Sequence, residues 1–495
     1  MKNIKIGLIA GAMALSIFTS CKKLDLFPYS NIATSQSFET IRDAKAWNVG
    51  LYSAFRGRVN GGYMFPQDVF GDQLNASLDF GNRNGAPHRW EIFPADGVFS
   101  GPWNGLYGAI ANINTAIVGF EGIPTASAAE AADLARYKGD NYLARAFYYH
   151  QLVLRFAKPY NPTTAATDLA VPVITKFDVT ALPARNTVKQ VYDQILADIN
   201  AARPLLASTA GVKGSNKFTI DILTALEARV KLSMQDWAGA YTAANSLITG
   251  GKYPLTTTAA AFKDLWHVDG NQEAIMQMSA NNSTEVTVTN GGSYLGLITA
   301  TKRWQPDFIP SQWVVDMYSD NDNRKATYFE KKDLTIQGLN YNGIWLVNKY
   351  PGNPALFTTA NTNYAHAFKV FNIGEMYLIA AEAAFRQPNE GNALTALNAL
   401  RTARGLTAVS STGAALLQDI KDERFRELAF EGTRLWDLKR WGEGFTRHDP
   451  QNVNIINVGP TYTGLTIAPN NPKFQWALPS ADISVNPNLV QNPGW

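Results

Sequence analysis

The sequence is poor in cysteine and in charge. Cys21 is the only cysteine among the 495 residues, so an intrachain disulfide is excluded. Charged residues make up 17% of the chain, below the roughly 25% of an average soluble domain, and 44 basic residues face 41 acidic ones for a formal net charge of +3. Attraction to nucleic acid through bulk charge is therefore not expected. Instead, 46% of the residues are hydrophobic and 12% are aromatic, which predicts a large, loop-rich globular protein and excludes a disordered or collagen-like chain.

The sequence starts with a hydrophobic run that is too short to span a membrane. This run occupies residues 6–18, whereas a transmembrane helix needs about 20 residues. Basic residues precede it, and two small residues follow it directly before Cys21. This order predicts a secretory signal over residues 1–20 and lipidation of Cys21. Several acyl chains on one cysteine would anchor the protein stably to a membrane.

Helical periodicity dominates the remaining chain. Apolar residues recur at steps of three to five over 129–156 and over 187–206, with Thr187 as the expected N-cap. Two further blocks, 219–248 and 371–404, each predict two helices joined by a short turn, with alanines where the helices cross. Such units resemble tetratricopeptide helix pairs. We therefore predict a mainly α fold, in which these pairs form a superhelical scaffold and long irregular loops build a binding face.

Residues 416–441 carry an unusual mixture of charges. The segment reads LLQDIKDERFRELAFEGTRLWDLKRW, and Phe425, Leu428, Leu435 and Leu438 are spaced as one helical stripe. Gly432 marks a gap where another element can approach closely. Carboxylates and arginines crowd the other faces, which predicts an ion-pair network with cations threaded between the carboxylates.

The run DERFRELAFEGTRLWDLKRWG resembles the hallmark segment of the SusD/RagB family of nutrient-binding outer-membrane lipoproteins. Other pieces that resemble the family follow its order along nearly the whole chain: Cys21 and the segments 33–55, 103–114, 141–160, 320–329 and 478–495. The resemblance implies a mainly helical protein with tetratricopeptide-like pairs. It also implies a lipoprotein that faces the cell exterior, lies over a TonB-dependent, SusC-like barrel and delivers glycans or, in some members, peptides to it.

The resemblance also suggests how the chain is divided. After the signal over residues 1–20, we expect one SusD-like body over residues 21–495. Its helical scaffold would include about 30–60, 103–250 and 370–441. The loop-rich binding region would cover about 57–102 and 280–365.

A catalytic role is disfavoured by the same residues. A glycosidase needs two opposed carboxylates about 5–10 Å apart, one of them with a raised pKa. Asp422, Glu423 and Glu427 could form such a pair, but nearby arginines would lower their pKa values and leave no general acid. The five histidines are not at metal-ligand spacing, and an HExxH motif is absent. We therefore predict a protein that is not an enzyme and that needs no metal or cofactor.

Loops with both aromatic and polar side chains are the candidate ligand contacts. A sugar ring offers C–H bonds on a face and hydroxyls at its edge, which stiff aromatic rings and neighbouring amides or charged groups can hold. On this basis the predicted ligand contacts are Trp90, Trp304, Tyr294, Asn82, Arg83 and Trp345. The predicted function is capture of oligosaccharides for a SusC-like barrel. The alternatives are a peptide cargo, a helical-repeat envelope scaffold without a nutrient, and a hydrolase.

Overall fold

The structure is a computed structural model that describes residues 37–278, 280 and 291–495. It is 49% helix and 10% strand, which confirms the predicted mainly α class. The α-helices are α2 (Ile41–Arg56), α3 (Phe65–Phe70), α4 (Gly85–Arg89), α5 (Gly97–Gly119), α6 (Ala128–Phe156), α7 (Val188–Leu206), α8 (Ile220–Ser233), α9 (Trp237–Thr249), α10 (Ala259–His267), α11 (Gly291–Tyr294), α12 (Gln312–Asp316), α13 (Lys325–Tyr328), α14 (Ile373–Arg386), α15 (Glu390–Ala403), α16 (Gly413–Glu427), α17 (Arg434–Trp441) and α18 (Ser480–Val485).

The strands are short except for one hairpin. They are β1 (Leu74–Ala76), β2 (Ala274–Met278), β3 (Leu297–Ile298), β4 (Arg303–Trp304), β5 (Phe308–Pro310), β6 (Phe329–Ile336), β7 (Leu339–Val347), β8 (Phe368–Asn372), β9 (Phe445–Thr446) and β10 (Thr466–Ile467). They form three two-stranded sheets, β1-β5, β2-β8 and β9-β10, and one four-stranded sheet in the order β3-β4-β6-β7.

The long helices begin where the sequence predicted. In α7 the Thr187 side chain accepts a hydrogen bond from the Gln190 backbone N–H at 3.2 Å, and the Gln190 side chain accepts one from the Thr187 N–H at 2.9 Å. This capping box satisfies two N–H groups that a helix start leaves without partners. The predictions of helices at 129–156 and 187–206 are confirmed to within a residue at their starts.

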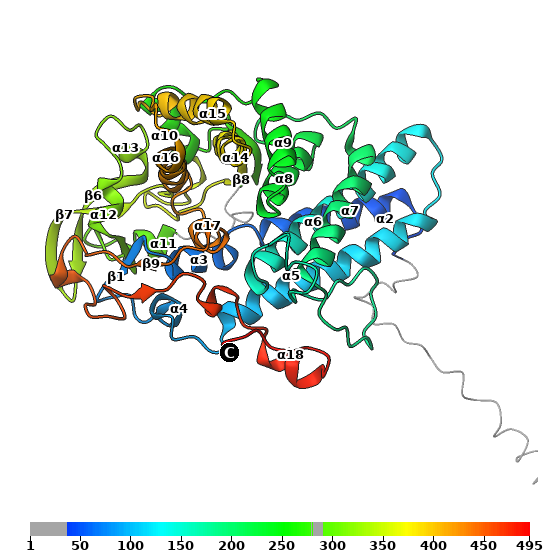
Figure 1. The fold of residues 1–495 in the computed structure, drawn as a ribbon, viewed down its shortest axis with the longest axis horizontal. Coiled ribbons are helices and arrows are strands. Elements are labelled where there is room, and N and C mark those ends of the chain that lie inside the picture. Colours follow the sequence, from blue (N-terminus) through cyan, green and yellow to red (C-terminus); the bar gives the residue numbers. More distant parts are fainter. Residues whose placement is uncertain (1–36, 279, 281–290) are drawn as a thin grey trace, which may run out of the picture.

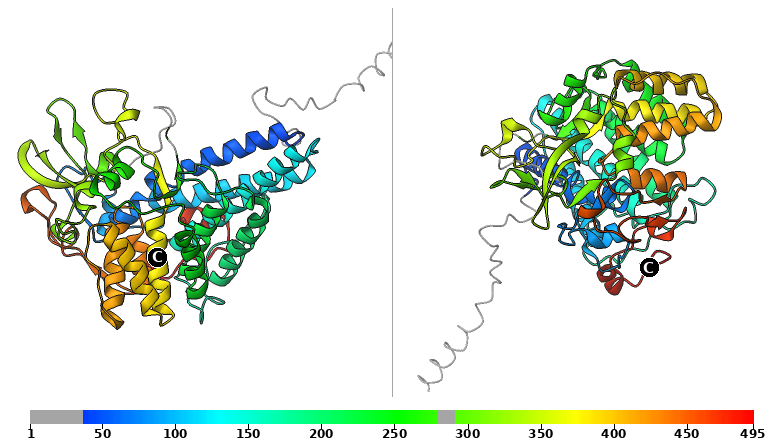
Figure 2. Two further views of the ribbon diagram at one scale, coloured as in Figure 1. Left: turned by 90° about the horizontal axis from the view of Figure 1, so that it is seen from above. Right: turned by 90° about the vertical axis from the view of Figure 1, so that its left-hand side faces the viewer.

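Two antiparallel helix pairs, α8 with α9 and α14 with α15, form the predicted tetratricopeptide-like units. The α9 and α14 helices also pack on each other, so the two pairs stand side by side, as Figure 2 shows for the green and yellow helices. Ala240 and Ala244 on α9 and Ala380 and Ala383 on α14 are fully buried. These small side chains let neighbouring helix backbones approach closely.

The prediction of an irregular loop region over 280–365 was wrong for its second half. β6 and β7 form a hairpin there, and β4 adds to β6 in parallel. Gln337 and Gly338 have φ values of 51° and 74°, the left-handed turn that matches the twist of a two-residue hairpin. Charged residues on the exposed side and a register shift after Lys332 hide the strand alternation in the sequence. Figure 1 places this hairpin at the end of the molecule opposite α2 and α7.

Residues 416–441 are two helices and not one stripe. α16 ends at Glu427 and α17 begins at Arg434, with Phe430 and Gly432 in the left-handed region at φ 63° and 69°. A Cβ atom at Gly432 would lie 2.8 Å from the Met64 side chain. The predicted close approach at this glycine is therefore confirmed, because only glycine fits both the backbone angle and the space.

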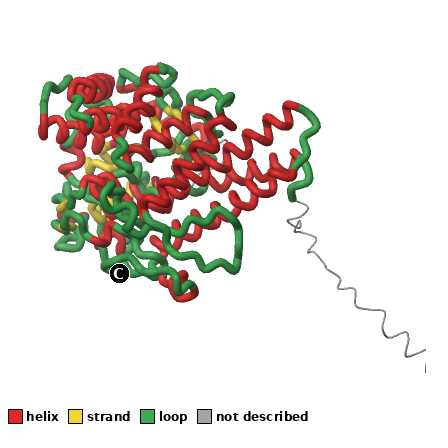
Figure 3. Tube along the Cα trace, turned by 45° about the vertical axis from the view of Figure 1, so that its right-hand side comes forward, coloured by secondary structure: helices red, strands yellow, loops and turns green. Residues whose placement is uncertain are grey.

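One hydrophobic cluster runs from Leu51 to Leu489 and includes side chains from the helix pairs, the four-stranded sheet and the C-terminal segment. Figure 3 shows long loops gathered along the lower part of the molecule, with helices filling the upper part. The helices thus form the frame against which the loops and short strands are held.

Candidate ligand surface

Two of the predicted ligand segments meet in the structure although more than two hundred residues separate them. β1 pairs with β5 in antiparallel register, which brings the chain after residue 77 next to the chain before residue 308. Beyond the strands, Arg83 donates to Asp307 at 2.9 Å, and Gln305 donates from its side-chain amide to Asp79 at 2.8 Å. The sequence predicted both segments as binding loops without predicting this contact.

A third segment joins the same place. Gln337, in the turn of the β6–β7 hairpin, donates its backbone N–H to Asp79 at 2.8 Å and its side-chain amide to the other oxygen of Asp79 at 2.6 Å. Charged hydrogen bonds of this kind are stronger than neutral ones. Asp79 therefore ties the three segments together, and we call the region formed by Asp79, Arg83, Trp304, Gln305 and Gln337 the junction surface.

Trp304 is partly buried at this junction. It lies in β4 beside Leu334 of β6, and the Lys332 ammonium lies 4.6 Å from the centre of its ring. A cation over an aromatic face is attracted by the electron density of the ring. The Lys332 ammonium, which also pairs with Glu330 at 2.8 Å, places a hydrogen-bond donor beside the ring.

Trp345 is also partly buried, on β7. Its backbone N–H donates to the Gln451 side chain at 3.0 Å, and Lys331 on the neighbouring strand lies 5.1 Å from its ring centre. Lys331 and Trp345 are direct cross-strand partners, so their side chains share one face of the hairpin. Trp345 therefore repeats the arrangement of Trp304 on a separate part of the sheet.

Asn82 and Arg83 are exposed, as the sequence predicted for loop residues. The Asn82 side-chain oxygen accepts a hydrogen bond from Arg89 at 2.8 Å, and its backbone has a left-handed φ of 56°. The Arg83 side chain is 62% exposed even though it pairs with Asp307. Both side chains thus retain free donors at the rim of the junction surface.

Trp90 lies in the core, contrary to the expectation of a ligand contact. It is 7% exposed, its indole N–H donates to the Phe70 carbonyl at 2.9 Å, and the rings of Phe445 and Phe474 pack against it. Its φ of 59° turns the chain inward just after α4. A ring that is enclosed in this way has no face left to stack on a sugar.

Tyr294 is buried as well. It is 1% exposed, and its hydroxyl donates to Asp68 at 3.2 Å. Burial raises the pKa of Asp68 to about 7, although hydrogen bonds from the Gly432 backbone and from Tyr294 oppose that shift. Tyr294 therefore has a structural role in joining α11 to α3, and we no longer place it at the ligand surface.

Sequence reasoning missed Tyr462, Lys332 and Gln337. Tyr462 is partly buried, and the Arg89 guanidinium lies 5.6 Å from its ring centre, next to Asn82. Its segment has no periodic pattern that would single it out. The two residues of the hairpin could have been found from the Gln337-Gly338 pair, because such a pair between two runs of alternating residues is typical of a tight hairpin turn.

The charged segment forms the predicted ion-pair network. Arg324 and Arg404, both fully buried, reach into it from elsewhere in the chain. Arg324 lies 2.7 Å from Glu423 and 2.9 Å from Glu427, and Arg404 lies 2.6 Å from Glu427. Burial alone would raise the pKa of Glu423, but Arg324, Arg426 and Arg401 outweigh it and lower the pKa to about 2. Glu423 is therefore ionised at neutral pH and has no proton to give as a general acid.

The described residues offer neither a cluster of metal ligands nor a helix that could span a membrane. Within 37–278, 280 and 291–495, no three side chains of His, Cys, Asp or Glu lie close enough together to hold a metal ion. None of the helices in these ranges combines the length and the apolar character needed to cross a membrane. The predicted signal over residues 1–20 and the predicted lipidation site, Cys21, lie outside the described residues.

Two family models match the chain, one in each half. The model of the SusD family matches residues 272–495. A SusD-like model, described as starch-binding and associating with the outer membrane, matches residues 24–232. Between them they include the ion-pair network, the α14–α15 pair and all three segments of the junction surface, and they leave residues 233–271, with α9, unmatched.

Individual relatives agree with these matches. SusD-like protein P38 of Formosa agariphila is 23% identical over 99% of both chains, and the starch-binding protein SusD of Bacteroides thetaiotaomicron is 33% identical over 26% of this chain and 21% of its own. The solved structure of a SusD superfamily protein from Bacteroides thetaiotaomicron covers 92% of this chain and 100% of its own, at 24% identity and a TM-score of 0.78. The chain belongs to the SusD/RagB family.

Proposed function

We propose that this protein is a lipid-anchored outer-membrane protein that captures oligosaccharides outside the cell and delivers them to a SusC-like, TonB-dependent barrel for import. The description of the family model over residues 24–232, starch-binding and associating with the outer membrane, supports the ligand class and the location. A solved SusD-like protein that binds laminarin, with a TM-score of 0.67 to this chain, supports a glycan as the cargo.

The junction surface is the observation that carries the proposal. Trp304 stands beside Lys332, and next along the chain Gln305 is fixed by Asp79. An aromatic ring can cover the C–H face of a sugar while amide, ammonium and carboxylate groups bond its hydroxyls. Because hydrogen bonds to Asp79 already hold the segments together, little ordering would be needed when a ligand binds.

Calorimetric titration of the mature protein with laminarin, starch and a peptide digest tests the ligand class. We expect heat of binding with at least one glycan and none with the peptides. Binding of peptides alone would favour the peptide alternative, and binding of neither would favour the scaffold. Release of shorter sugars during long incubation with the bound glycan would show a hydrolase and contradict the proposal.

Substitution of Trp304 tests the site separately from the function. Trp304→Ala removes a large aromatic contact, and losses at such positions are about 2 kcal/mol or more, or roughly 30-fold in Kd. The matched control is Trp237→Ala on α9, where a partly buried tryptophan also has a cation, Arg386, over its ring at 5.7 Å. Unchanged glycan affinity in Trp304→Ala would reject the junction surface and leave the function standing.

An exposed apolar strip supports the presence of a protein partner. Phe177, Val179, Leu182 and Val485 are between 50% and 82% exposed, and they line one groove of about 500 Å³ between α5, the chain after α6 and α18. Exposed apolar side chains gathered in this way mark surfaces that another protein covers. We assign this strip to the barrel that would receive the glycan.

Copurification of the barrel from detergent-solubilised membranes tests this assignment. Val179→Asp puts a charge into the strip and is expected to reduce recovery of the barrel at least tenfold. Val212→Asp is the control, because Val212 is also exposed, at 58%, but lies outside the groove. Equal recovery of the barrel with both variants would reject the strip as the docking surface.

A further inference from the structure

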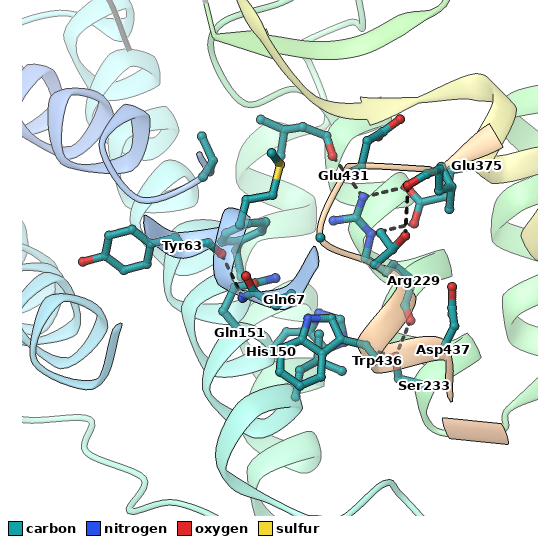
Figure 4. A pocket seen from close by; sticks show the side chains of 18 of the residues that line it. Tyr63, Gln67, His150, Gln151, Arg229, Ser233, Glu375, Glu431, Trp436 and Asp437 are labelled. Atoms are coloured by element: carbon teal, nitrogen blue, oxygen red, sulfur yellow. Dashed lines mark hydrogen bonds and ion pairs between the residues drawn. The ribbon is translucent and has the colours of Figure 1, made fainter. Parts of the chain in front are cut away.

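A small polar cavity lies at the centre of the frame, where α3, α6, α8, α14, α16 and α17 meet. Figure 4 shows side chains from these elements facing one another across it, among them Gln67, His150, Arg229 and Glu375. Its volume is about 120 Å³, small beside the roughly 300–1,000 Å³ of clefts that hold drug-sized ligands. This space is too small for an oligosaccharide, so the cavity has a separate role from the junction surface.

Basic side chains outnumber acidic ones in the cavity wall. The basic ones are Arg58, Arg155, Arg229, Lys369, Arg424 and Arg440. The acidic ones are Glu375, Glu431 and Asp437. Each carboxylate already has a cation: Glu375 pairs with Arg229 at 2.6 Å, Asp437 with Arg424 at 2.7 Å, and Glu431 with Lys349, from outside the wall, at 2.6 Å. Arg440 is paired with Glu382 at 2.6 Å.

Three cations of the wall have no carboxylate at ion-pair distance in the described part of the chain, although Asp269, Glu431 and Glu273 act on Lys369 from farther away and oppose the lowering of its pKa. Arg58, Arg155 and Lys369 form no ion pair with any residue in the described part of the chain. Burial lowers the pKa of Arg155 to about 9 and that of Lys369 to about 8, values at which both are still mainly charged at pH 7. Buried charge without a counter-ion costs several kcal/mol per ion.

Two arginines of the wall also have unused donors. Arg155 is 1% exposed and Arg424 is 5% exposed. The Nε of Arg155 and one terminal nitrogen of Arg424, Nη1, have no hydrogen-bond acceptor among residues 37–278, 280 and 291–495. The other donors of Arg155 are used by the Gln151 side chain and the Tyr63 carbonyl, at 2.7 and 2.5 Å. Buried N–H groups are usually hydrogen-bonded, and a bound ion or water can supply the acceptor here.

We propose that the cavity binds a small free oxyanion, such as sulfate or phosphate, between Arg155 and Arg424. An oxyanion offers several acceptor oxygens and negative charge in a volume that the cavity can hold, and arginine is well suited to bind such groups. Since Arg155 lies on α6 and Arg424 on α16, the anion joins the long helices to the charged segment and stabilises the frame.

The test is thermal unfolding of the mature protein at constant ionic strength, with sodium sulfate or phosphate replacing sodium chloride. A ligand that binds only the folded state raises Tm in a saturable way. We expect such a rise, and a Kd from calorimetry that is at least tenfold weaker in Arg155→Gln. The matched control is Arg447→Gln, because Arg447 is 2% exposed, lacks an ion pair to any described residue and has a pKa lowered by burial to about 9, yet lies outside the cavity.

A second variant and a direct measurement keep the test decisive if Arg155→Gln does not fold. Arg58→Gln changes a partly buried residue of the wall and should weaken sulfate binding at least threefold. Crystals soaked in selenate should show an anomalous peak between Arg155 and Arg424. Equal Tm values in sulfate, phosphate and chloride would overturn the proposal, and so would a selenate peak elsewhere. Binding of galacturonate but of neither sulfate nor phosphate would also overturn it, because the cavity would then recognise the carboxylate of a sugar cargo.

Discussion

Substitution of Arg404 by methionine is expected to produce one of the largest losses of stability in this protein. Arg404 is fully buried and holds two carboxylates at once. It donates to the two oxygens of Glu427 at 2.6 and 3.0 Å and to those of Glu273 at 2.7 and 2.9 Å. Methionine fills similar space, but of the described residues that bond Glu273 it leaves only Thr256, through its backbone N–H and hydroxyl.

Removal of one partner from a buried ion pair typically costs about 3–5 kcal/mol. Whole domains are stable by only about 5–15 kcal/mol, so Arg404→Met removes a large share of the total. The loss also depends on pH. Burial raises the pKa of Glu427, but Arg404 and Arg324 outweigh it, so the folded-state pKa lies below the usual 4.5. The stability that comes from the lowered pKa of Glu427 is present above pH 4.5 and is lost as pH falls through the folded-state pKa. The unfolding free energies of wild type and variant should therefore converge in acid.

Urea unfolding followed by tryptophan fluorescence at pH 7 and pH 4 measures both effects. The control is Arg401→Met, because Arg401 lies 3.1 Å from Glu423 and that carboxylate keeps Arg324 and Arg426 as partners. We expect a smaller loss than for Arg404→Met, because Glu423 is buried but keeps two cations after the change. The reasoning fails if Arg404→Met loses no more than Arg401→Met at pH 7, or if its loss is the same at pH 4.

Three further outcomes are expected. In chemical denaturation, Gly432→Ala should lose more unfolding free energy than Gly338→Ala, for which we expect a loss of about 1 kcal/mol. Both glycines have a left-handed φ, but of the two only the Cβ at 432 would collide with a neighbour. Equal losses would contradict the close approach at Gly432. Thr187→Ala should cost about 0.5–2 kcal/mol by removing the cap of α7, and Thr187→Ser should restore most of it in the same measurement. Cys21→Ser should move the protein from the membrane fraction to the soluble fraction on cell fractionation, and retention in the membrane would argue against lipidation of Cys21.

The helices were predictable from the sequence because each signal is local. The cap at Thr187 depends on Gln190 three residues later, and the apolar face of α7 depends on the residues within it. The β6–β7 hairpin was missed because each strand is stabilised by pairing with the other, and the residues within one strand do not reveal that partner. Its outer face carries charged residues such as Lys331, and the bulge after Lys332 interrupts the alternation.

The meeting of the two candidate segments was not predictable, and the sequence pointed only to the segments themselves. Loops near residues 79–90 and 293–305 do meet, but the choice of aromatic within each loop depends on tertiary packing. Trp90 and Trp304 both stand beside polar residues in the sequence. Trp90 itself has a left-handed φ at the end of α4, and its ring packs on Phe70. Trp304 lies in a two-residue strand next to a lysine. Composition cannot distinguish these two outcomes, because both rings satisfy the same local pattern.

The ion-pair network explains how a motif without ligand contacts can still position the ligand surface. Arg324 comes from the segment 320–329 and its partners from 416–441, so neither segment can be buried without the other. The network fixes α16, and the chain that follows it donates the Gly432 N–H to Asp68 on α3 at 3.0 Å. Four residues after α3, β1 begins and pairs with β5 at the junction surface. The charged motif therefore positions α3 and β1, and with them the chain that leads to the junction surface.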